Sequence, residues 1–310
     1  MRTGRRLFFS ILLILILCLS VSAALAAFQY CPYCGKDLEN KEYAFCPYCG
    51  KQLDTSGSGG VTTTLGGNGS ISARVFEVSE TVRMSHGGAT ITWTDSANAA
   101  PYYVAYRYAD GNESDQVWYW AGGDEASSKA GSTSFTCYNL VPGHAYDISV
   151  ADSSGKEIVG RVNVPGAPEF VDGKLKAAAL KVKLAPRYFS RSAYDVTKAK
   201  SLNKFVSSQM DFASNCYGLR LEIGHPQLGK ERHYPALLAF YAPNSYCWSF
   251  YDEDFNMATF ANGGSTYYYC VGSFFFDALH DKYGSVPRGN YRVEVYFDGM
   301  YVGQNSFSVE

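Results

Sequence analysis

The stretch from Phe135 to Val150, FTCYNLVPGHAYDISV, is the most informative part of the chain about its fold. Apolar and polar residues alternate on both sides of a Pro142-Gly143 turn, as in two half-buried β-strands joined at a corner. The alternation predicts inward-facing side chains at Phe135, Cys137, Leu140, Tyr146, Ile148 and Val150. We interpret Cys137 as a buried, unpaired thiol without chemical function.

Seven short strand candidates separated by Gly, Asn, Asp and Ser turns occupy about 96 residues around this stretch. Such a count and spacing predict an antiparallel β-sandwich. Inward positions are expected at Ile91 and Trp93, and at Tyr102, Val104 and Tyr106. The strand candidates are ARVFEVS (73–79), ATITWT (89–94), PYYVAYRYA (101–109), QVWYWAG (116–122), TSFTCYNL (133–140), AYDISVA (145–151) and EIVGRVNV (157–164).

Residues 71–166 resemble the fibronectin type III module. The resemblance rests on the pattern of FTCYNLVPGHAYDISV, in which an aromatic strand, a Pro-Gly corner and a Tyr-x-Ile-x-Val strand follow one another. It implies that Tyr146 is the tyrosine-corner residue, with its hydroxyl bonded to upstream backbone. The chain has no Arg-Gly-Asp loop, so the adhesion function of some relatives does not carry over.

The remainder, residues 167–310, follows a stiff VPGAPEF join at 164–170 and reads mostly as strands, with TYYYCVGSFFF (266–276) among them. Tyr291, Val293, Val295 and Phe297 alternate with polar residues, and Asp298-Gly299 forms a two-residue hairpin turn. From about Pro287 onward the pattern resembles the closing hairpin of Ig-like domains in bacterial envelope proteins. We therefore expect a second, Ig-like β-sandwich, with one short helix within TKAKSLNKFVSSQMDFAS (197–214).

Near the N-terminus, residues 28–53 contain a doubled CPYCGK unit. Cys31 and Cys34 form the first pair, and Cys46 and Cys49 form the second after an eleven-residue spacer. Two residues between thiols let one tight turn aim both sulfurs at one ion, so the four cysteines predict a closed, structural Zn²⁺ site. The pattern resembles the short zinc-ribbon family of bacterial proteins.

Two alternatives to zinc stay open for these thiols. The four cysteines would form two disulfides in an oxidising compartment. CPYC is also a dithiol redox motif, but that motif requires a βαβ frame, and neither a hydrophobic strand nor a long helix flanks either copy. Zinc is favoured because a segment of fewer than about 30 residues cannot bury enough apolar area to fold alone. A structural zinc contributes on the order of 10–16 kcal/mol.

Residues 1–27 have the pattern of an export signal. Arg2, Arg5 and Arg6 precede an apolar run that ends in small residues, as in a secretory signal peptide. The run is also long enough, at roughly 20 residues, for an uncleaved membrane anchor. Either way the downstream chain is expected to be secreted or anchored at the outer face of the cytoplasmic membrane.

The linker and the charge balance limit the kinds of partner that we expect for this chain. Residues 54–70 are rich in Gly, Ser and Thr and behave as a flexible tether. Lys and Arg number 27 against 29 Asp and Glu; without the three leader arginines the balance is 24 against 29. No Lys/Arg cluster follows the leader in the sequence, so a nucleic-acid partner is not expected, and the membrane is contacted only through the N-terminal segment.

Candidate chemistry in the last domain is sparse. Cys216 lies nine residues before His225, and together they would form a thiol–imidazole pair. Asp252, Glu253 and Asp254 would offer oxygen ligands to calcium, but three consecutive acids lack the alternate spacing of a calcium loop and fit a solvated turn better. Cys247 and Cys270, on neighbouring strand candidates, would be able to form a disulfide outside the cell.

Aromatic clusters at Trp118-Tyr119-Trp120, at Tyr246 with Trp248, and at Tyr267-Tyr268-Tyr269 place some rings on opposite sheet faces. Core packing accounts for most of them, and an exposed ring would stack on a sugar or anchor a protein. We therefore expect a non-catalytic exported protein, with no cofactor besides zinc, that binds a protein or glycan or acts as a spacer at the cell surface. The alternatives are a carbohydrate-binding protein and an envelope hydrolase with its active site in the last domain.

Metal analysis of the purified protein without its leader tests the prediction of a zinc ribbon. We expect about one zinc per chain, with Cys31, Cys34, Cys46 and Cys49 protected from thiol reagents, because thiolates closed around zinc react slowly. Cys31→Ser should lose the metal, while Cys137→Ser should retain it. A chain that contains two disulfides and no metal would contradict the zinc prediction.

Overall fold

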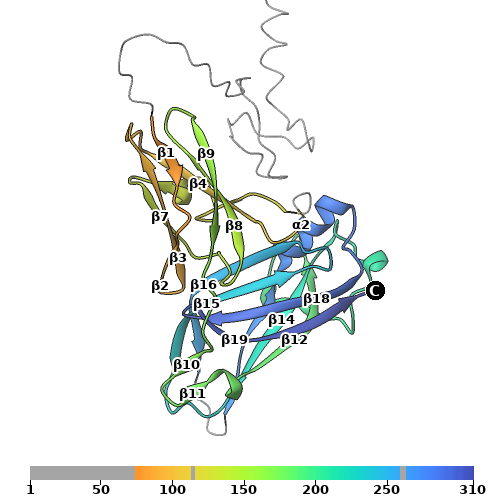
Figure 1. Cartoon of the computed structure of the whole chain (residues 1–310). Coiled ribbons are helices and arrows are strands. Elements are labelled where there is room, and N and C mark those ends of the chain that lie inside the picture. The colour runs from red at the N-terminus through yellow and green to blue at the C-terminus, as the bar shows by residue number, and fades with distance from the viewer. Residues whose placement is uncertain (1–73, 113–115, 259–262) are drawn as a thin grey trace, which may run out of the picture. The chain divides into compact units, whose positions relative to one another are not determined.

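The computed structural model describes residues 74–112, 116–258 and 263–310, and this part of the chain is mostly β (Figure 1). Its strands form several sheets, and one α-helix accompanies them among the described residues. We call the layers built from β1 to β9 the first sandwich and those built from β12 to β19 the second sandwich. The predicted leader (1–27), zinc ribbon (28–53) and linker (54–70) lie outside the described residues.

The first sandwich pairs a sheet in which β1, β2 and β7 all flank β3 with a sheet of order β5-β4-β8-β9, to which β6 adds at β4. All of its strand pairs are antiparallel, as the sequence predicts. The strands are β1 Phe76–Val78, β2 Arg83–Ser85, β3 Gly88–Asp95, β4 Tyr102–Tyr108, β5 Tyr119–Trp120, β6 Lys129–Ala130, β7 Ser134–Cys137, β8 Ala145–Ala151 and β9 Glu157–Asn163.

Side-chain alternation along these strands builds the first core. Ile91 and Trp93 on β3 are buried, as are Tyr102, Val104 and Tyr106 on β4, so these inward positions are confirmed. All seven predicted strands are present, with ends shifted by a few residues. The strands β2 and β6 were not predicted, because two or three residues are too few to show an alternating pattern.

The corner before β8 is held by the buried Tyr146 hydroxyl, which accepts a hydrogen bond of 2.9 Å from the backbone N–H of Val141. Tyr146 also packs edge-on against the rings of Tyr106 and Tyr108. Leu140, Ile148 and Val150 are fully buried beside it, and Cys137 is a buried free thiol, as predicted. Burial raises the pKa of Cys137 to about 12, so the thiol stays protonated and unreactive.

The second sandwich pairs two four-stranded antiparallel sheets, of order β13-β12-β14-β17 and β16-β15-β18-β19. A small hairpin of β10 and β11 precedes them. The strands are β10 Val171–Asp172, β11 Leu175–Lys176, β12 Lys181–Ser190, β13 Lys200–Ser201, β14 Asn215–His225, β15 Arg232–Tyr241, β16 Cys247–Met257, β17 Gly264–Val271, β18 Gly289–Phe297 and β19 Met300–Val309.

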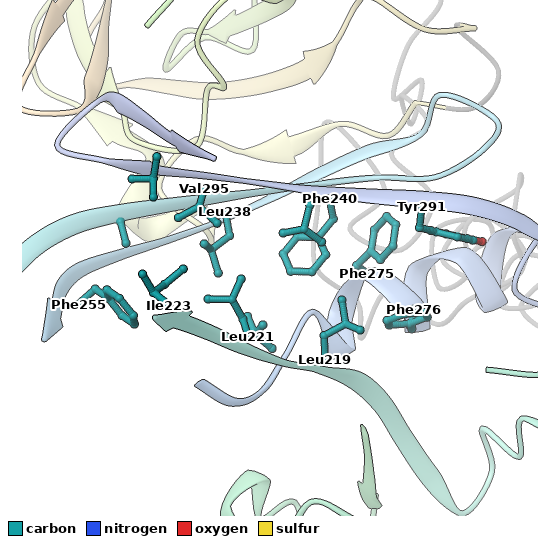
Figure 2. Packing of buried hydrophobic residues seen from close by; sticks show 14 of the residues in the cluster. Leu219, Leu221, Ile223, Leu238, Phe240, Phe255, Phe275, Phe276, Tyr291 and Val295 are labelled. Carbon is teal, nitrogen blue, oxygen red and sulfur yellow. The ribbon is translucent and has the colours of Figure 1, made fainter. Parts of the chain in front are cut away.

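The core of the second sandwich lies between its two sheets and the helix α2, Ser273–Tyr283 (Figure 2). Leu219, Leu221 and Ile223 of β14 point toward Leu238 and Phe240 of β15. Phe275 and Phe276 of α2 close one end of this core and are fully buried. Each such phenylalanine stabilises the fold by roughly 1.5–3 kcal/mol through the apolar surface that it removes from water.

The helix prediction was wrong in position. Residues 197–214 contain short 3-10 turns and the strand β13, whereas the α-helix begins at Ser273, inside a stretch that we expected to be a strand. Phe275, Phe276 and Leu279 are spaced to face one side of a helix, and all three are fully buried. At the far end, Gly284 takes a φ of 73°, and its N–H donates to His280 O at 2.8 Å, a helix end that glycine favours.

The closing hairpin agrees with the prediction. Asp298 and Gly299 have φ of 48° and 75°, which the tight turn between β18 and β19 requires. Phe297 and Met300 pair directly across it. Tyr291, Val293, Val295 and Phe297 are all buried.

Tyr146→Phe tests the corner of the first sandwich. The change removes only the hydroxyl and leaves the buried N–H of Val141 without its acceptor. We expect the free energy of unfolding to fall by about 1–3 kcal/mol. The control is Tyr194→Phe, at a tyrosine that is 52% exposed and should tolerate the change. Equal effects of the two substitutions in denaturant unfolding would contradict this role.

Candidate functional site

The structure separates the candidate thiol–imidazole pair. Cys216 and His225 lie near opposite ends of β14, nine residues apart, so their Cα atoms are roughly 30 Å from each other. Cys216 packs beside Phe189 and Cys270 on the outward side of the sheet. His225 Nδ1 lies 3.0 Å from the carbonyl of Pro226. Burial raises the pKa of Cys216, which keeps it a thiol.

The three consecutive acids lie inside β16 and not in a turn, so the solvated-turn prediction was wrong. Asp252 accepts a 2.5 Å hydrogen bond from the Tyr268 hydroxyl, while Asp254 lies 2.6 Å from His233 Nδ1. Asp252 and Asp254 are thus engaged with different partners, Tyr268 and His233. Within 74–112, 116–258 and 263–310, no three His, Cys, Asp or Glu side chains come together as a metal site would require. The four ribbon cysteines lie outside these ranges.

Cys247 and Cys270 do not form the disulfide considered above. Cys247 belongs to the core cluster that includes the first sandwich, whereas Cys270 lies with Cys216 and Phe189. Both are free thiols. Burial raises the pKa of each, to about 12 for Cys270, so neither is poised to react.

Most of the aromatic clusters serve the cores. The hydroxyls of Tyr119 and Tyr246 contact each other across the two sandwiches, and Tyr246 is fully buried. Trp248 packs against Phe240. The exposed rings of the three clusters are Tyr267 and Tyr269, at 38% and 49% exposure.

A continuous core joins the two sandwiches, which the sequence pattern did not predict. Leu237, Ala239 and Tyr241 of β15 and Tyr296 of β18 point away from the second core and pack with the buried residues of the first sandwich. Ala236, Leu238 and Phe240 face the opposite way, into the second core. The sheet β16-β15-β18-β19 is therefore covered on both faces along these strands.

A chain of polar contacts crosses this interface. Asp110 Oδ2 lies 2.8 Å from His144 Nδ1, and His144 Nε2 lies 3.0 Å from the Tyr241 hydroxyl. Tyr241 in turn donates to Glu294 Oε2 at 3.0 Å. Tyr296 donates to the same oxygen at 2.9 Å. Polar groups of both sandwiches thus satisfy one another where the interface excludes water.

Arg292 completes the charge balance around Glu294. Its Nε lies 3.2 Å from Glu294 Oε1, and its guanidinium carbon lies 4.3 Å from the centre of the Tyr241 ring. A buried carboxylate is costly unless it is paired and hydrogen-bonded. Here a guanidinium and two hydroxyls supply those partners.

These groups link the two sandwiches by hydrogen bonds from neutral hydroxyls. Burial raises the pKa of Tyr241 and the pKa of Tyr296 far above the usual value of a tyrosine, and the nearby Glu294 carboxylate adds to both effects. Both hydroxyls therefore keep their protons and act as donors at any physiological pH. A nucleophile or general base would need the opposite shift.

The two sandwiches also meet at two turns. Gly87 and Gly299 have φ of 77° and 75°. A Cβ on Gly299 would lie 3.1 Å from the Cα of Gly87, so backbone contacts backbone at this point. A hollow of about 290 Å³ beside the turns is lined by apolar residues such as Met84, Pro142 and Met300.

One feature of the sequence indicated that β15 is buried on both faces. PALLAFYA, from Pro235 to Ala242, has no charged or amide residue. A strand with one face toward water would instead alternate apolar and polar residues. The polar partners carried no such signal, because Asp110, His144, Tyr241 and Glu294 are far apart along the chain.

The chain matches no protein-family model and no curated protein. Among solved structures, domains 5-6 of the S-layer protein SbsC are similar at 12% identity, with 76% of this chain and 98% of that chain covered and a TM-score of 0.17. At this identity and TM-score the likeness supports no conclusion about function.

Among the residues that the structure describes, no helix has the length and apolar character needed to cross a membrane.

Tyr241→Phe tests the interface. Losing the hydroxyl removes the partner shared by His144 and Glu294, so we expect about 1–3 kcal/mol less stability toward denaturant. Tyr188→Phe, at a half-buried ring away from the interface, is the control. A loss in Tyr241→Phe no larger than in the control would show that the polar chain does not couple the sandwiches.

Proposed function

We propose that this chain is a non-catalytic exported or cell-surface protein whose two sandwiches act as one rigid binding or spacer unit. The observation that carries the proposal is the sheet covered on both faces, with Leu237, Ala239 and Tyr241 packed into the first sandwich. Neighbouring domains move relative to one another by default unless their interface is large and apolar. A core that continues through the interface favours rigidity.

We further propose that the first sandwich is a fibronectin type III module and the second an Ig-like domain. The tyrosine corner at Tyr146 and the division into sheets β1-β3-β7 and β5-β4-β8-β9 support the first assignment. The antiparallel sheets of the second sandwich and its closing hairpin at Asp298-Gly299 support the second.

The N-terminal part of the proposal rests on sequence. Residues 1–27 would export or anchor the chain, and Cys31, Cys34, Cys46 and Cys49 would hold a structural Zn²⁺ in a ribbon on a flexible tether. The partner would be a protein or glycan at the cell surface. Nucleic acid is not proposed as a partner, and membrane contact would come only from the N-terminal segment.

The hydrolase alternative loses its main support. It requires Cys216 and His225 to approach each other, yet they lie near opposite ends of one strand. The raised pKa of Cys216 also disfavours a thiolate. We therefore propose that the protein is not an enzyme.

Ala239→Glu tests rigidity. Ala239 is fully buried on the face of β15 that packs against the first sandwich, so a carboxylate there should force the sandwiches apart. We expect one calorimetric unfolding transition for residues 71–310 in the unmodified chain and two transitions in the variant. Ala185→Glu, on the water-exposed side of β12, should keep one. Two independent transitions in the unmodified chain would refute the single-unit proposal.

Location is tested separately by treating intact cells with a membrane-impermeant amine reagent. The full chain should be labelled, because Lys183 and Lys198 are 62% and 79% exposed. A variant without residues 2–27 should be labelled only after lysis. Equal protection of both chains in intact cells would place the protein inside.

A further inference from the structure

The outward face of the sheet β12-β14-β17 carries charged and aromatic side chains in regular rows. Register pairs Lys183 with Glu222 and Glu222 with Tyr267, so these side chains form one row across three strands. Ala185 and Arg220 form the next row. The opposite face of the same strands carries Leu219, Leu221 and Ile223 into the second core.

This face is basic. The three strands contain four Lys or Arg residues and a single acid. The acid, Glu222, accepts from Lys183 at 3.1 Å and lies 3.5 Å from Arg220 Nη2. One carboxylate cannot neutralise four cations, so the face keeps a positive excess although the whole chain is slightly acidic. The four cations are Lys181, Lys183, Arg187 and Arg220.

Two tyrosine rings border the cations. The Arg220 guanidinium carbon lies 4.1 Å from the centre of the Tyr267 ring, a stacked contact that holds the arginine in place. The Tyr267 and Tyr269 rings meet edge to face at 5.2 Å. Tyr269 is 49% exposed, so its ring is open to a ligand.

The row next to that of Lys183, Glu222 and Tyr267 is shallow at its middle position. Gly224 lies opposite Lys181 on β12 and opposite Ser265 on β17. A Cβ built on Gly224 would have its nearest neighbour at 3.5 Å, the Cβ of Lys181. An extended polymer can therefore lie across the strands without meeting a large side chain there.

From this arrangement we propose that the outward face of β12-β14-β17 binds an acidic polysaccharide. A sugar ring stacks on Tyr269, while Arg220 and Lys183 bind the carboxylates of the polymer. Open aromatic rings suit the apolar face of a sugar, and cations on a flat surface suit a repeating negative charge. The inference gives a ligand class to the surface role proposed above.

Other ligands fit this face less well. A neutral glycan would leave the positive excess of this face unmatched, and a protein ligand would be expected to find more apolar surface than two rings provide. Nucleic acid would use the same charges and rings, but the chain as a whole carries more acidic than basic residues.

Binding to immobilised polygalacturonate tests the proposal with the purified full chain. We expect binding that weakens as salt is raised. Fully methyl-esterified polygalacturonate, which has the same sugar ring without the charge, should bind at least about tenfold more weakly. Tyr269→Ala and Arg220→Gln should each lower the affinity for the charged polymer by about tenfold.

The matched controls are Tyr138→Ala, at a 38% exposed tyrosine of the first sandwich, and Lys204→Gln, at an exposed lysine paired with Glu310. Both should bind like the unmodified chain, and thermal unfolding should confirm that every variant is folded. No binding at low salt, full binding by Tyr269→Ala, equal binding of the esterified polymer, or tighter binding of an oligothymidylate would each overturn the proposal. The assay uses purified protein, so its result is independent of the rigidity and location tests above.

Discussion

Leu237, Ala239 and Tyr241 face the first sandwich while Leu238 and Phe240 face the second, so this part of β15 has no side toward water. Burial of one strand in two cores makes each sandwich part of the packing of the other. Removing either would expose a row of apolar side chains, at a cost of about 25 cal/mol per Å². This free-energy cost of exposing apolar surface keeps the two sandwiches in one arrangement.

Polar groups make that arrangement specific. Apolar contact alone permits sliding, but the contacts from Asp110 through His144 and Tyr241 to Glu294 are satisfied only in one register. The backbone approach of Gly87 to Gly299 adds a steric constraint at a second point. A unit held in this way can present an outer surface in a constant geometry, which suits a role in binding or spacing.

Prediction from the sequence was accurate where the pattern is local. Ile91 and Trp93 alternate with polar residues on one strand, so their burial could be predicted. Asp298-Gly299 is a turn signal by itself, so the closing hairpin could be predicted as well. It was wrong for residues 273–276, because SFFF is an apolar run that suits a strand as well as a helix end. Only packing of Phe275 and Phe276 against the second core distinguishes the two.

The sequence by itself therefore determined the strands, the turns and the inward positions of the first sandwich, because these depend on neighbours within a few residues. Tertiary structure alone decided which strands share a core, that Cys247 lies far from Cys270, and that Lys183, Arg220 and Tyr269 meet on one face. Those outcomes depend on contacts between strands distant along the chain. An alternating pattern indicates that a side chain points away from the core of its own sandwich. It does not indicate whether water or another domain covers that side.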